Sequence, residues 1–324
     1  MFKTSIALLL AAVAVVGCEN TQSRLDSVAT QAPKGTQAAA APVNTQADHS
    51  GDVETRLRRL EDNYAKHAEA LEFLGKVYAQ QKQQQAQQEQ SEPDPTAVFA
   101  VAVDNDVKAG KVDGPNTAIV TVVKAFDFAC PYCERAASTM DDLVKEYDGK
   151  VRIVYKDMVV HPQVATDAHL ATCAAAKQGK YLAYNHAVWE KGFKPYAASR
   201  DPSKLGKENL MALAKELGLD TTKLQADMGG ECQKVIQDDM AELAKFKVNS
   251  TPTFFVNGIH VGGALPKEAF KKIIDERLAV AEQSGVSGAD YYEKEVMGKG
   301  VKQFRSKAEA GGGGGGDPHA GHGH

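Results

Sequence analysis

The sequence predicts an α/β domain in which a βαβ half and a ββα half flank a long helical insertion. An apolar run over residues 117–126 leads into a helix-like stretch, and a second apolar run over 151–156 follows it. This is the order of a strand, a helix and a parallel strand. Much later, strand-like segments over 253–256 and 259–261 are separated by an Asn-Gly pair, which favours a tight hairpin turn.

The N-terminus has the layout of a secretory signal. Lys3 precedes an uncharged run over residues 4–17, which is too short to span a bilayer. We therefore expect residues 1–17 to be a signal peptide and the protein to reach the periplasm or cell envelope. Residues 15–18 also resemble a bacterial lipobox, so we expect Cys18 to be lipidated and the lipid anchor to be the membrane contact. An ordinary cleaved signal that leaves Cys18 as a free thiol is the alternative.

Two segments separate the anchor from the domain. Residues 18–52 carry almost no large apolar side chain and predict a flexible linker. Over residues 53–92 we expect a coiled-coil stalk, because apolar residues recur at alternating spacings of four and three, interrupted at His67. These residues are Val53, Leu57, Leu60, Tyr64, Leu71, Leu74 and Tyr78. We expect a homo-oligomer through residues 53–90; a single amphipathic helix packed on its own domain is the alternative.

The domain itself is expected over residues 96–283. Two prolines end the stalk helix before it, and a first short strand is expected over 97–103. Helix-like patterns dominate an insertion over 160–248, and a helix over 266–283 closes the domain. The whole is the layout of a thioredoxin-like fold with a helical insertion.

Residues 284–324 are polar and are expected to form a tail with one short helix around residues 289–297. The tail ends in a glycine run followed by His319, His322 and His324. Imidazoles on a flexible end can capture copper, nickel or zinc, and a solvated end that binds nothing is the alternative. The net charge of −4 comes without a basic cluster, so no binding to nucleic acid is expected.

The candidate reactive site is Cys130-Pro131-Tyr132-Cys133, between the strand at 117–126 and the helix-like stretch. Two sulfurs three positions apart on a first helical turn can close and reopen a disulfide, so no external cofactor is expected. The helix N-terminus favours a thiolate, which makes Cys130 the expected nucleophile and Cys133 the expected resolving thiol. Half of a zinc site and a chance pair are the alternatives.

Cys173 and Cys232 remain once Cys18 and the reactive pair are set aside. Both fall in helical-looking sequence between the third strand and the segment that begins at Thr251. In an oxidising compartment, an even number of cysteines indicates that they pair in disulfides. We therefore expect a structural disulfide between Cys173 and Cys232. Two buried free thiols are the alternative.

With this order of elements the chain resembles the DsbA-like thiol-disulfide oxidoreductases over roughly residues 117–283. Three stretches carry the resemblance: residues 126–133 around the cysteine pair, His161-Pro162 with residues 171–174 and 178–181, and residues 251–258. They resemble the active-site turn, the start of the helical insertion and the substrate-side loop with its hairpin. Some relatives also carry a second cysteine pair at places comparable to Cys173 and Cys232.

The resemblance implies roles for four further residues. Pro252 is expected to be a cis proline that faces the cysteine pair, and Thr251 to offer its backbone to the substrate chain. Asp127 and Lys156 look like a buried acid and its partner that help to move the proton of Cys133. A carboxylate that stabilises a turn is the alternative for Asp127.

The function that this implies is an exported, membrane-tethered thiol-disulfide oxidoreductase that acts on cysteine-containing client proteins and is served by a membrane redox partner. The stalk resembles that of periplasmic disulfide isomerases and copper-sensitivity suppressor proteins, so an oligomeric isomerase or reductase is expected. A dithiol oxidase that installs disulfides is one alternative. A copper-binding envelope protein without redox turnover is the other.

Overall fold

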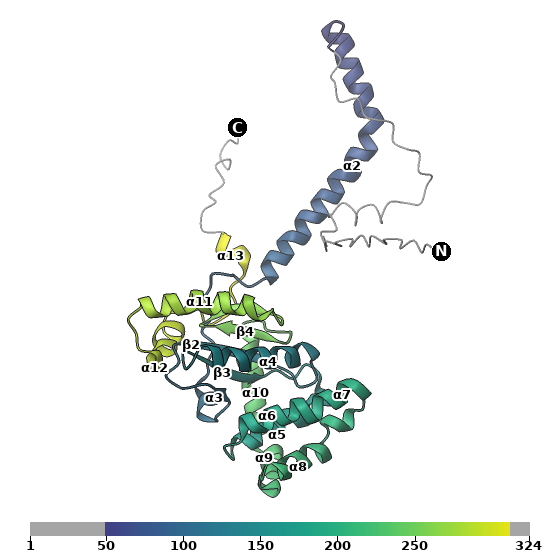
Figure 1. Cartoon of the computed structure of the whole chain (residues 1–324). Coiled ribbons are helices and arrows are strands. Elements are labelled where there is room, and N and C mark those ends of the chain that lie inside the picture. The colour runs from purple at the N-terminus through teal and green to yellow at the C-terminus, as the bar shows by residue number, and fades with distance from the viewer. Residues whose placement is uncertain (1–48, 312–324) are drawn as a thin grey trace, which may run out of the picture. The chain divides into compact units, whose positions relative to one another are not determined.

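The computed structural model describes residues 49–311 of the 324-residue chain, which are coloured in Figure 1. The expected signal peptide, the lipidation site Cys18, most of the linker and the histidine-rich end of the tail lie outside the described residues. Within residues 49–311, no helix combines the length and the apolar character that crossing a membrane requires.

Helix α2 (Val53–Ser91) spans 39 residues and occupies the segment in which the stalk is expected. The chain divides into two units, Met1–Glu72 and Phe73–His324, and the boundary falls within this helix. The Asp52 carboxylate accepts a hydrogen bond of 2.8 Å from the Thr55 N–H and so caps its first turn. None of the residues of α2 is buried, so its apolar seam is open to solvent in this structure.

The centre of the domain is a five-stranded sheet in the order β1-β3-β2-β4-β5. Strands β2 and β3 are parallel and are connected by α4, whereas the other neighbours are antiparallel. This confirms the predicted α/β frame. The elements are β1 (Val112–Asp113), β2 (Val120–Phe126), α4 (Pro131–Glu146), β3 (Val151–Asp157), β4 (Thr253–Val256) and β5 (Ile259–Gly262).

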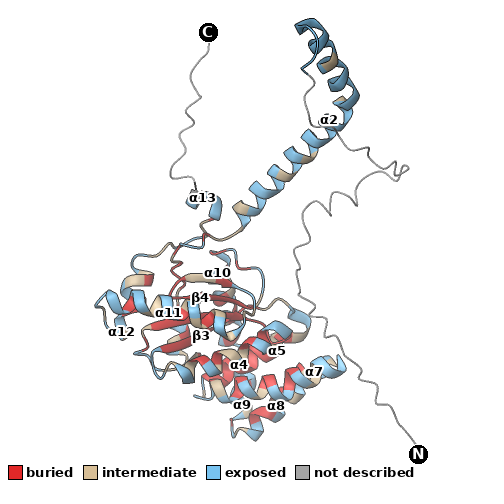
Figure 2. Ribbon diagram, turned by 45° about the horizontal axis from the view of Figure 1, so that its top comes forward, coloured by how far each residue is buried: buried red, intermediate tan, exposed pale blue. Residues whose placement is uncertain are grey.

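Both faces of the three central strands β2, β3 and β4 are buried, as the red strands in Figure 2 show. Every residue of β2 is buried, and successive residues point to opposite faces. Val122 and Phe126 face a core that includes side chains of α4 and of α11 (Lys267–Gln283). Val123 and Ala125 face a second core, formed with residues near the two ends of the domain. The face on which a side chain lies therefore decides whether it reaches the cysteine pair.

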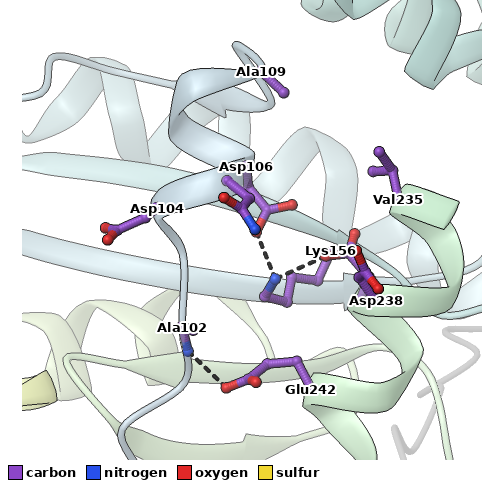
Figure 3. Close-up of a pocket in the computed structure, with 10 residues that line it drawn as sticks. Ala102, Asp104, Asp106, Ala109, Lys156, Val235, Asp238 and Glu242 are labelled. Carbon is purple, nitrogen blue, oxygen red and sulfur yellow. Dashed lines mark hydrogen bonds and ion pairs between the residues drawn. The ribbon is translucent and has the colours of Figure 1, made fainter. Parts of the chain in front are cut away.

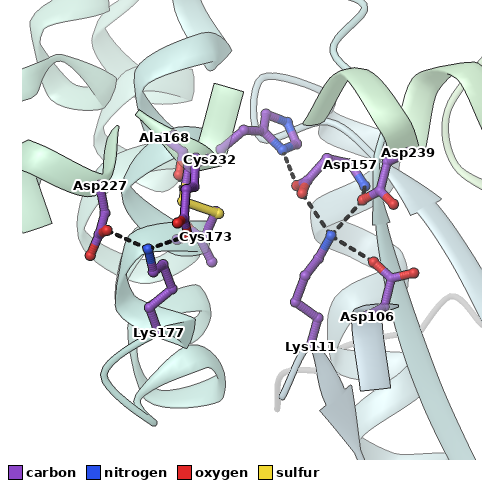
Figure 4. Close-up of a disulfide and its surroundings, with 12 residues drawn as sticks. Asp106, Lys111, Asp157, Ala168, Cys173, Lys177, Asp227, Cys232 and Asp239 are labelled. Atoms are coloured by element: carbon purple, nitrogen blue, oxygen red, sulfur yellow. Dashed lines mark hydrogen bonds and ion pairs between the residues drawn. A yellow bond between two sulfur atoms is a disulfide. The ribbon is translucent and has the colours of Figure 1, made fainter. Parts of the chain in front are cut away.

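The helical insertion lies between β3 and β4. Two of its helices are joined by a disulfide between Cys173 of α5 and Cys232 of α10, with a Cα–Cα distance of 5.7 Å (Figure 4). The disulfide therefore closes the first and last helices of the insertion on each other. Its helices are α5 (Pro162–Ala176), α6 (Tyr181–Ala187), a π-helical continuation η1 (Val188–Phe193), α7 (Lys194–Ser199), η2 (Pro202–Leu205), α8 (Lys207–Glu216), α9 (Thr221–Gly229) and α10 (Glu231–Ala244).

The structure differs from the expected first strand over 97–103. Val98 makes an isolated antiparallel bridge with Ile259, and Phe99 makes a parallel one with Val301. The segment runs between the edge strand β5 and the C-terminal part of the chain, and pairs with each at one residue, so no ladder forms. It continues into the short helix α3 (Asp104–Lys108) and into β1 at the opposite edge of the sheet.

The structure also differs from the expected polar tail, because residues after 284 pack on the domain. Helix α12 (Gly288–Tyr291) and the π-helical η3 (Tyr292–Met297) follow α11, and Tyr291, Tyr292 and Val296 are buried in the second core. The Tyr292 hydroxyl donates a hydrogen bond of 2.8 Å to the Val101 carbonyl. A few apolar side chains among many charged ones were enough to anchor this segment. A last helix, α13 (Lys307–Gly311), ends the described part.

Removal of the disulfide between Cys173 and Cys232 is expected to lower the free energy of unfolding by about 2–4 kcal/mol, because the bridge restricts the unfolded chain. Urea unfolding of the double variant Cys173→Ala/Cys232→Ala, compared with the wild type at equal pH, measures the change. The reactivity of Cys130 toward an alkylating agent serves as the control and is expected to stay the same. Equal unfolding midpoints would contradict a stabilising role for the disulfide.

Candidate active site at the start of helix α4

Two free thiols lie at the start of α4. Cys130 is the residue before the helix and has an extended backbone, Pro131 is its first residue, and Cys133 lies in its first turn. Proline suits this place because its fixed φ is helical and its missing N–H would have no helical partner. Both cysteines are buried, whereas Tyr132 between them is 55% exposed. The Tyr132 side chain is therefore open to solvent, next in sequence to two buried sulfurs.

The two sulfurs hold their protons very differently. The hydrogen bond that the Cys133 thiol donates to the Cys130 sulfur has the largest effect on the pKa of Cys130. Together with hydrogen bonds from the Thr251 side chain and from the backbone of the first turn, it overcomes burial and lowers the pKa of Cys130 to about 5. Burial, followed by the hydrogen bond and the charge of Cys130, raises the pKa of Cys133 well above its usual value. At neutral pH, Cys130 is a thiolate and Cys133 is a thiol, as an attacking and a resolving cysteine require.

The loop before β4 lies against Cys130. The Thr251–Pro252 peptide bond is cis, and the Thr251 carbonyl accepts a hydrogen bond of 3.3 Å from Cys130 Sγ when this sulfur is protonated. The antiparallel pairing of β4 with β2 brings this loop beside the cysteines, although more than a hundred residues separate them. The structure thus brings Thr251 and Pro252 to the reactive pair.

Asp127 supports the turn that precedes Cys130. Its side chain is fully buried, and one carboxylate oxygen accepts hydrogen bonds from the N–H groups of Val160 (2.7 Å) and His161 (2.9 Å). The other accepts one from the Ala129 N–H at 2.7 Å and lies 3.2 Å from His161 Nδ1. Asp127 therefore ties the active-site turn to the start of the insertion, which agrees with the alternative of a turn carboxylate.

Lys156 does not meet Asp127 in this structure, and this corrects the expected pair. Its amine lies 2.5 Å from Asp106 and 2.8 Å from Asp239. In the register of the sheet, Lys156 is opposite Ala125, which faces the second core, whereas the cysteine pair belongs to the first core. The side chain therefore points away from α4.

Lys156 belongs to a buried charge cluster formed with Asp106, Lys111, Asp157 and Asp239 (Figures 3 and 4). Lys111 Nζ lies 2.9 Å from carboxylate oxygens of both Asp106 and Asp157. Burial alone would lower the pKa of Lys111, but the three carboxylates raise it well above its usual value. Sequence reasoning missed this cluster, because its members come from elements far apart in the chain and no local pattern marks them.

His169 connects the charge cluster to the active-site turn. Its buried Nδ1–H donates a hydrogen bond of 2.6 Å to Asp157, which leaves Nε2 to accept one of 3.3 Å from the Phe128 N–H. Phe128 precedes Cys130 by two residues. The position of the nucleophile therefore depends on buried charges that do not touch it.

A cavity of about 430 Å³ opens beside the charge cluster (Figure 3). Acidic side chains of α3 and α10 line it together with Lys156, and neither cysteine does. In the described part of the chain, no group of three His, Cys, Asp or Glu side chains is placed to hold a metal ion.

A thiolate and a thiol at the start of a helix, on this α/β frame, are the groups that exchange between thiols and disulfides requires. The chain belongs to the thioredoxin family: the family model described as Thioredoxin matches residues 106–276, which is more than half of the chain.

Two curated relatives each match more than half of the chain. The Na(+)/H(+) antiporter NhaA 3 of Salinispora tropica is 34% identical over 188 residues, which are 57% of this chain and 27% of the antiporter. The Na(+)/H(+) antiporter NhaA of Herminiimonas arsenicoxydans is 28% identical over 171 residues, 52% of this chain and 26% of the antiporter. The chain thus spans about a quarter of the length of these relatives.

Similar solved structures include a thioredoxin-like oxidoreductase from Silicibacter pomeroyi (33% identity, 51% of this chain and 90% of that chain, TM-score 0.45). Another is α-DsbA1 of Wolbachia pipientis (19% identity, 57% and 96%, TM-score 0.48). A linker-deletion variant of ScsC from Proteus mirabilis matches 72% of this chain and 100% of its own, with 18% identity and a TM-score of 0.46.

The alkylation rate of Cys130 by iodoacetamide is expected to rise with pH and to level off above an apparent pKa of about 5, because the thiolate is the reactive form. In Cys133→Ala the strongest stabilising hydrogen bond is absent, so the apparent pKa is expected to rise by about 1–2 units. Mass spectrometry of the modified protein across pH measures both. A wild-type value near that of a free cysteine, roughly 8.5, would contradict a stabilised thiolate.

Proposed function

We propose that this protein is an exported thiol-disulfide oxidoreductase that exchanges disulfides with client proteins through Cys130 and Cys133. The opposite protonation of the two sulfurs is the observation that supports it most directly. Thr251, whose carbonyl lies against Cys130, is the backbone group that a client segment would meet beside the nucleophile. Pro252 and Tyr132 would complete the contact surface.

The reaction needs no group besides the cysteine pair. Cys130 thiolate attacks a client disulfide, forms a mixed disulfide and releases one client sulfur as a thiolate. Cys133 then loses its proton and attacks Cys130, which closes the Cys130–Cys133 disulfide and releases the second client thiolate. The client gains two electrons and the cysteine pair loses two. The reverse sequence donates a disulfide, and the relative reduction potentials decide the direction.

Within this class we propose an isomerase that works as an oligomer. An isomerase must remain reduced and reactive, and a stabilised thiolate provides both properties. The same stabilisation raises the reduction potential of the pair, which makes an oxidase that installs disulfides the second candidate and argues against a strong reductant. The α2 seam favours the isomerase, because several active sites on one assembly can act on one misfolded client.

Self-association is proposed through α2. The helix buries none of its 39 residues, and large apolar side chains remain exposed along one seam, among them Leu57 (51%), Leu60 (66%) and Leu74 (57%). A row of apolar residues at this spacing is stable in water when it is covered by a matching helix. A second copy of the same helix offers that match.

The remaining proposals concern export, membrane attachment and the redox partner of the protein. We propose that residues 1–17 direct export to the periplasm or envelope and that Cys18 carries the lipid anchor. A membrane redox partner would restore the cysteine pair after each cycle of net transfer. Metal capture by His319, His322 and His324 stays a prediction from sequence.

Replacement of the resolving cysteine is expected to trap clients. In Cys133→Ser the mixed disulfide at Cys130 cannot be resolved, so client proteins are expected to remain covalently bound on non-reducing gels and to be released by dithiothreitol. In Cys130→Ser insulin reduction is expected to fall to the uncatalysed rate, and no adduct is expected. Full insulin reduction by either variant would contradict the proposed roles.

Seam substitutions in the full chain test the oligomer. Leu60→Glu/Leu74→Glu places charges on the seam and is expected to give a monomer by light scattering, whereas the wild type is a multimer. Ala65→Glu/Ala79→Glu, at exposed positions off the seam, is the matched control and is expected to remain a multimer.

The same variants separate an isomerase from an oxidase. The seam variant is expected to lose most of its refolding of scrambled ribonuclease, yet to keep insulin reduction per active site, because each site remains intact. A wild-type monomer would contradict the coiled-coil proposal, and unchanged ribonuclease refolding by a monomeric variant would favour the oxidase.

A further inference from the structure

A second cavity lies toward the end of the sheet opposite to the cysteine pair. Its volume is about 300 Å³, which suits a small ligand. Strand β3 contributes Arg152, which is in register with Thr121 near the start of β2, whereas Cys130 follows the other end of β2. Helix α3 and the segment after α11 form most of the remaining walls, and neither cysteine lines the cavity. The cavity is therefore separate from the reactive site.

One wall of this cavity comes from the C-terminal segment that packs on the domain. Ala289, Tyr292 and Glu293 line it, and all three follow the stretch that the thioredoxin family model matches, which ends at residue 276. The Tyr292 side chain is buried in the second core, and its hydroxyl already donates a hydrogen bond to the Val101 carbonyl. The cavity is thus completed by a part of the chain that lies outside the family match.

Arg152 brings a buried positive charge to the cavity. It is 6% exposed, and a guanidinium stays charged at physiological pH. Its hydrogen bonds go to neutral oxygens, because Nε donates to Thr121 Oγ1 at 2.9 Å and Nη1 lies 3.5 Å from the Asn116 carbonyl oxygen. Unlike Lys111 and Lys156, it forms no ion pair with a carboxylate in the described part of the chain. A buried charge without a counterion is costly, which favours a bound anion at this place.

Charges of both signs line the same cavity without pairing. Asp104 and Glu293 contribute carboxylates, and Lys108 contributes a second cation; all three residues are exposed. Burial lowers the pKa of Arg152, and Tyr292 and Asp104 oppose this shift, so Asp104 acts on the guanidinium from a distance. Within residues 49–311, none of these four charged groups forms an ion pair with another. The cavity keeps opposite charges apart, and a ligand that carries both charges fits between them.

The remaining lining narrows the kind of ligand further. Val103, Val107 and Ala289 offer apolar side chains, so a ligand with a small apolar group can cover them. Phosphate and other multiply charged anions are disfavoured, because the two exposed carboxylates would repel them. A simple amine is disfavoured in turn by the guanidinium. A carboxylate and an ammonium on one small molecule satisfy both sets of charges.

We propose that this cavity binds a small zwitterion, an amino acid or a short peptide, whose carboxylate meets Arg152 and whose ammonium meets Asp104 and Glu293. A guanidinium can donate two parallel hydrogen bonds to one carboxylate. Thr121 holds Nε, and Nη2 makes no hydrogen bond with any residue in the part of the chain that the structure describes. Because the cysteine pair takes no part in the cavity, binding here is independent of the proposed exchange reaction.

L-Leucine and two analogues test the proposal in the full chain. Leucine carries both charges and an apolar side chain, 4-methylpentanoate lacks the ammonium, and 3-methylbutylamine lacks the carboxylate. In protein labelled with ¹⁵N-arginine, the Nε resonance of Arg152 reports the contact directly. Leucine is expected to shift it saturably with a dissociation constant of about 1 mM or lower. 4-Methylpentanoate is expected to bind about tenfold more weakly, and 3-methylbutylamine is expected to leave the resonance unshifted.

Variants assign the binding to these residues. Arg152→Met is expected to weaken leucine binding about tenfold or more, measured by saturation-transfer NMR on the ligand. Arg200→Met, at an exposed arginine of the insertion, is the matched control and is expected to bind leucine like the wild type. If Arg152→Met does not fold, Asp104→Asn/Glu293→Gln at exposed positions replaces it. This variant is expected to bind leucine about tenfold more weakly and 4-methylpentanoate at least as well as the wild type.

The remaining arms identify the ligand and can overturn the proposal. Tighter binding of the dipeptide alanyl-leucine than of leucine would support a peptide as the ligand, and the reverse order would support an amino acid. Tighter binding of inorganic phosphate than of either would overturn the zwitterion in favour of a simple anion. The proposal is also wrong if neither leucine nor alanyl-leucine shifts the Arg152 resonance saturably, or if a folded Arg152→Met variant binds leucine like the wild type. Cys130→Ser is expected to bind leucine normally, so a failure of this site leaves the proposed function untouched.

Discussion

The hydrogen bond that the Cys133 thiol gives to the Cys130 sulfur determines how the whole site behaves. It is the largest stabilisation of the Cys130 thiolate, and the same contact keeps Cys133 protonated. A second negative charge in a buried site is costly, so both sulfurs cannot ionise together. In the proposed exchange, attack therefore begins at Cys130, and Cys133 would become reactive only when Cys130 has lost its charge to a client bond. The order of the two exchanges follows from electrostatics.

The residues around the cysteine pair hold the turn before Cys130 in place by hydrogen bonds to its backbone N–H groups. Asp127 and His169 engage the N–H groups of Ala129 and Phe128, so the turn before Cys130 is held from both sides. His169 is oriented in turn by Asp157, a member of the buried charge cluster. Buried ion pairs add little net stability. Their value here is positional, because they join α3, β3 and α10 to one another and to the turn that presents the nucleophile.

Local patterns predicted the parts of the fold that depend on neighbouring residues. The Asn257-Gly258 turn adopts positive φ at both residues, as an Asn-Gly hairpin requires, and the strand-helix-strand unit has the predicted parallel pairing. The partners of buried charges depend instead on register. The resemblance pairs Lys156 with Asp127, yet a step of one residue along β3 reverses the face on which a side chain lies. The lysine on the face of the cysteine pair is Lys124, one strand away, and no local pattern distinguished the two.

The small apolar area exposed on the domain is a reason to expect several active sites to act together. In the part of the domain that the structure describes, Tyr132 and Val280 are the exposed large apolar side chains, whereas the others lie on α2. In the proposed function, a single active site would thus offer a client little apolar area, and its hold would rest on the exchanging sulfur and on backbone contacts. Weak sites gain from being joined, since binding at one site raises the effective concentration at the next. A helix that gathers several domains would supply the affinity that an individual site lacks.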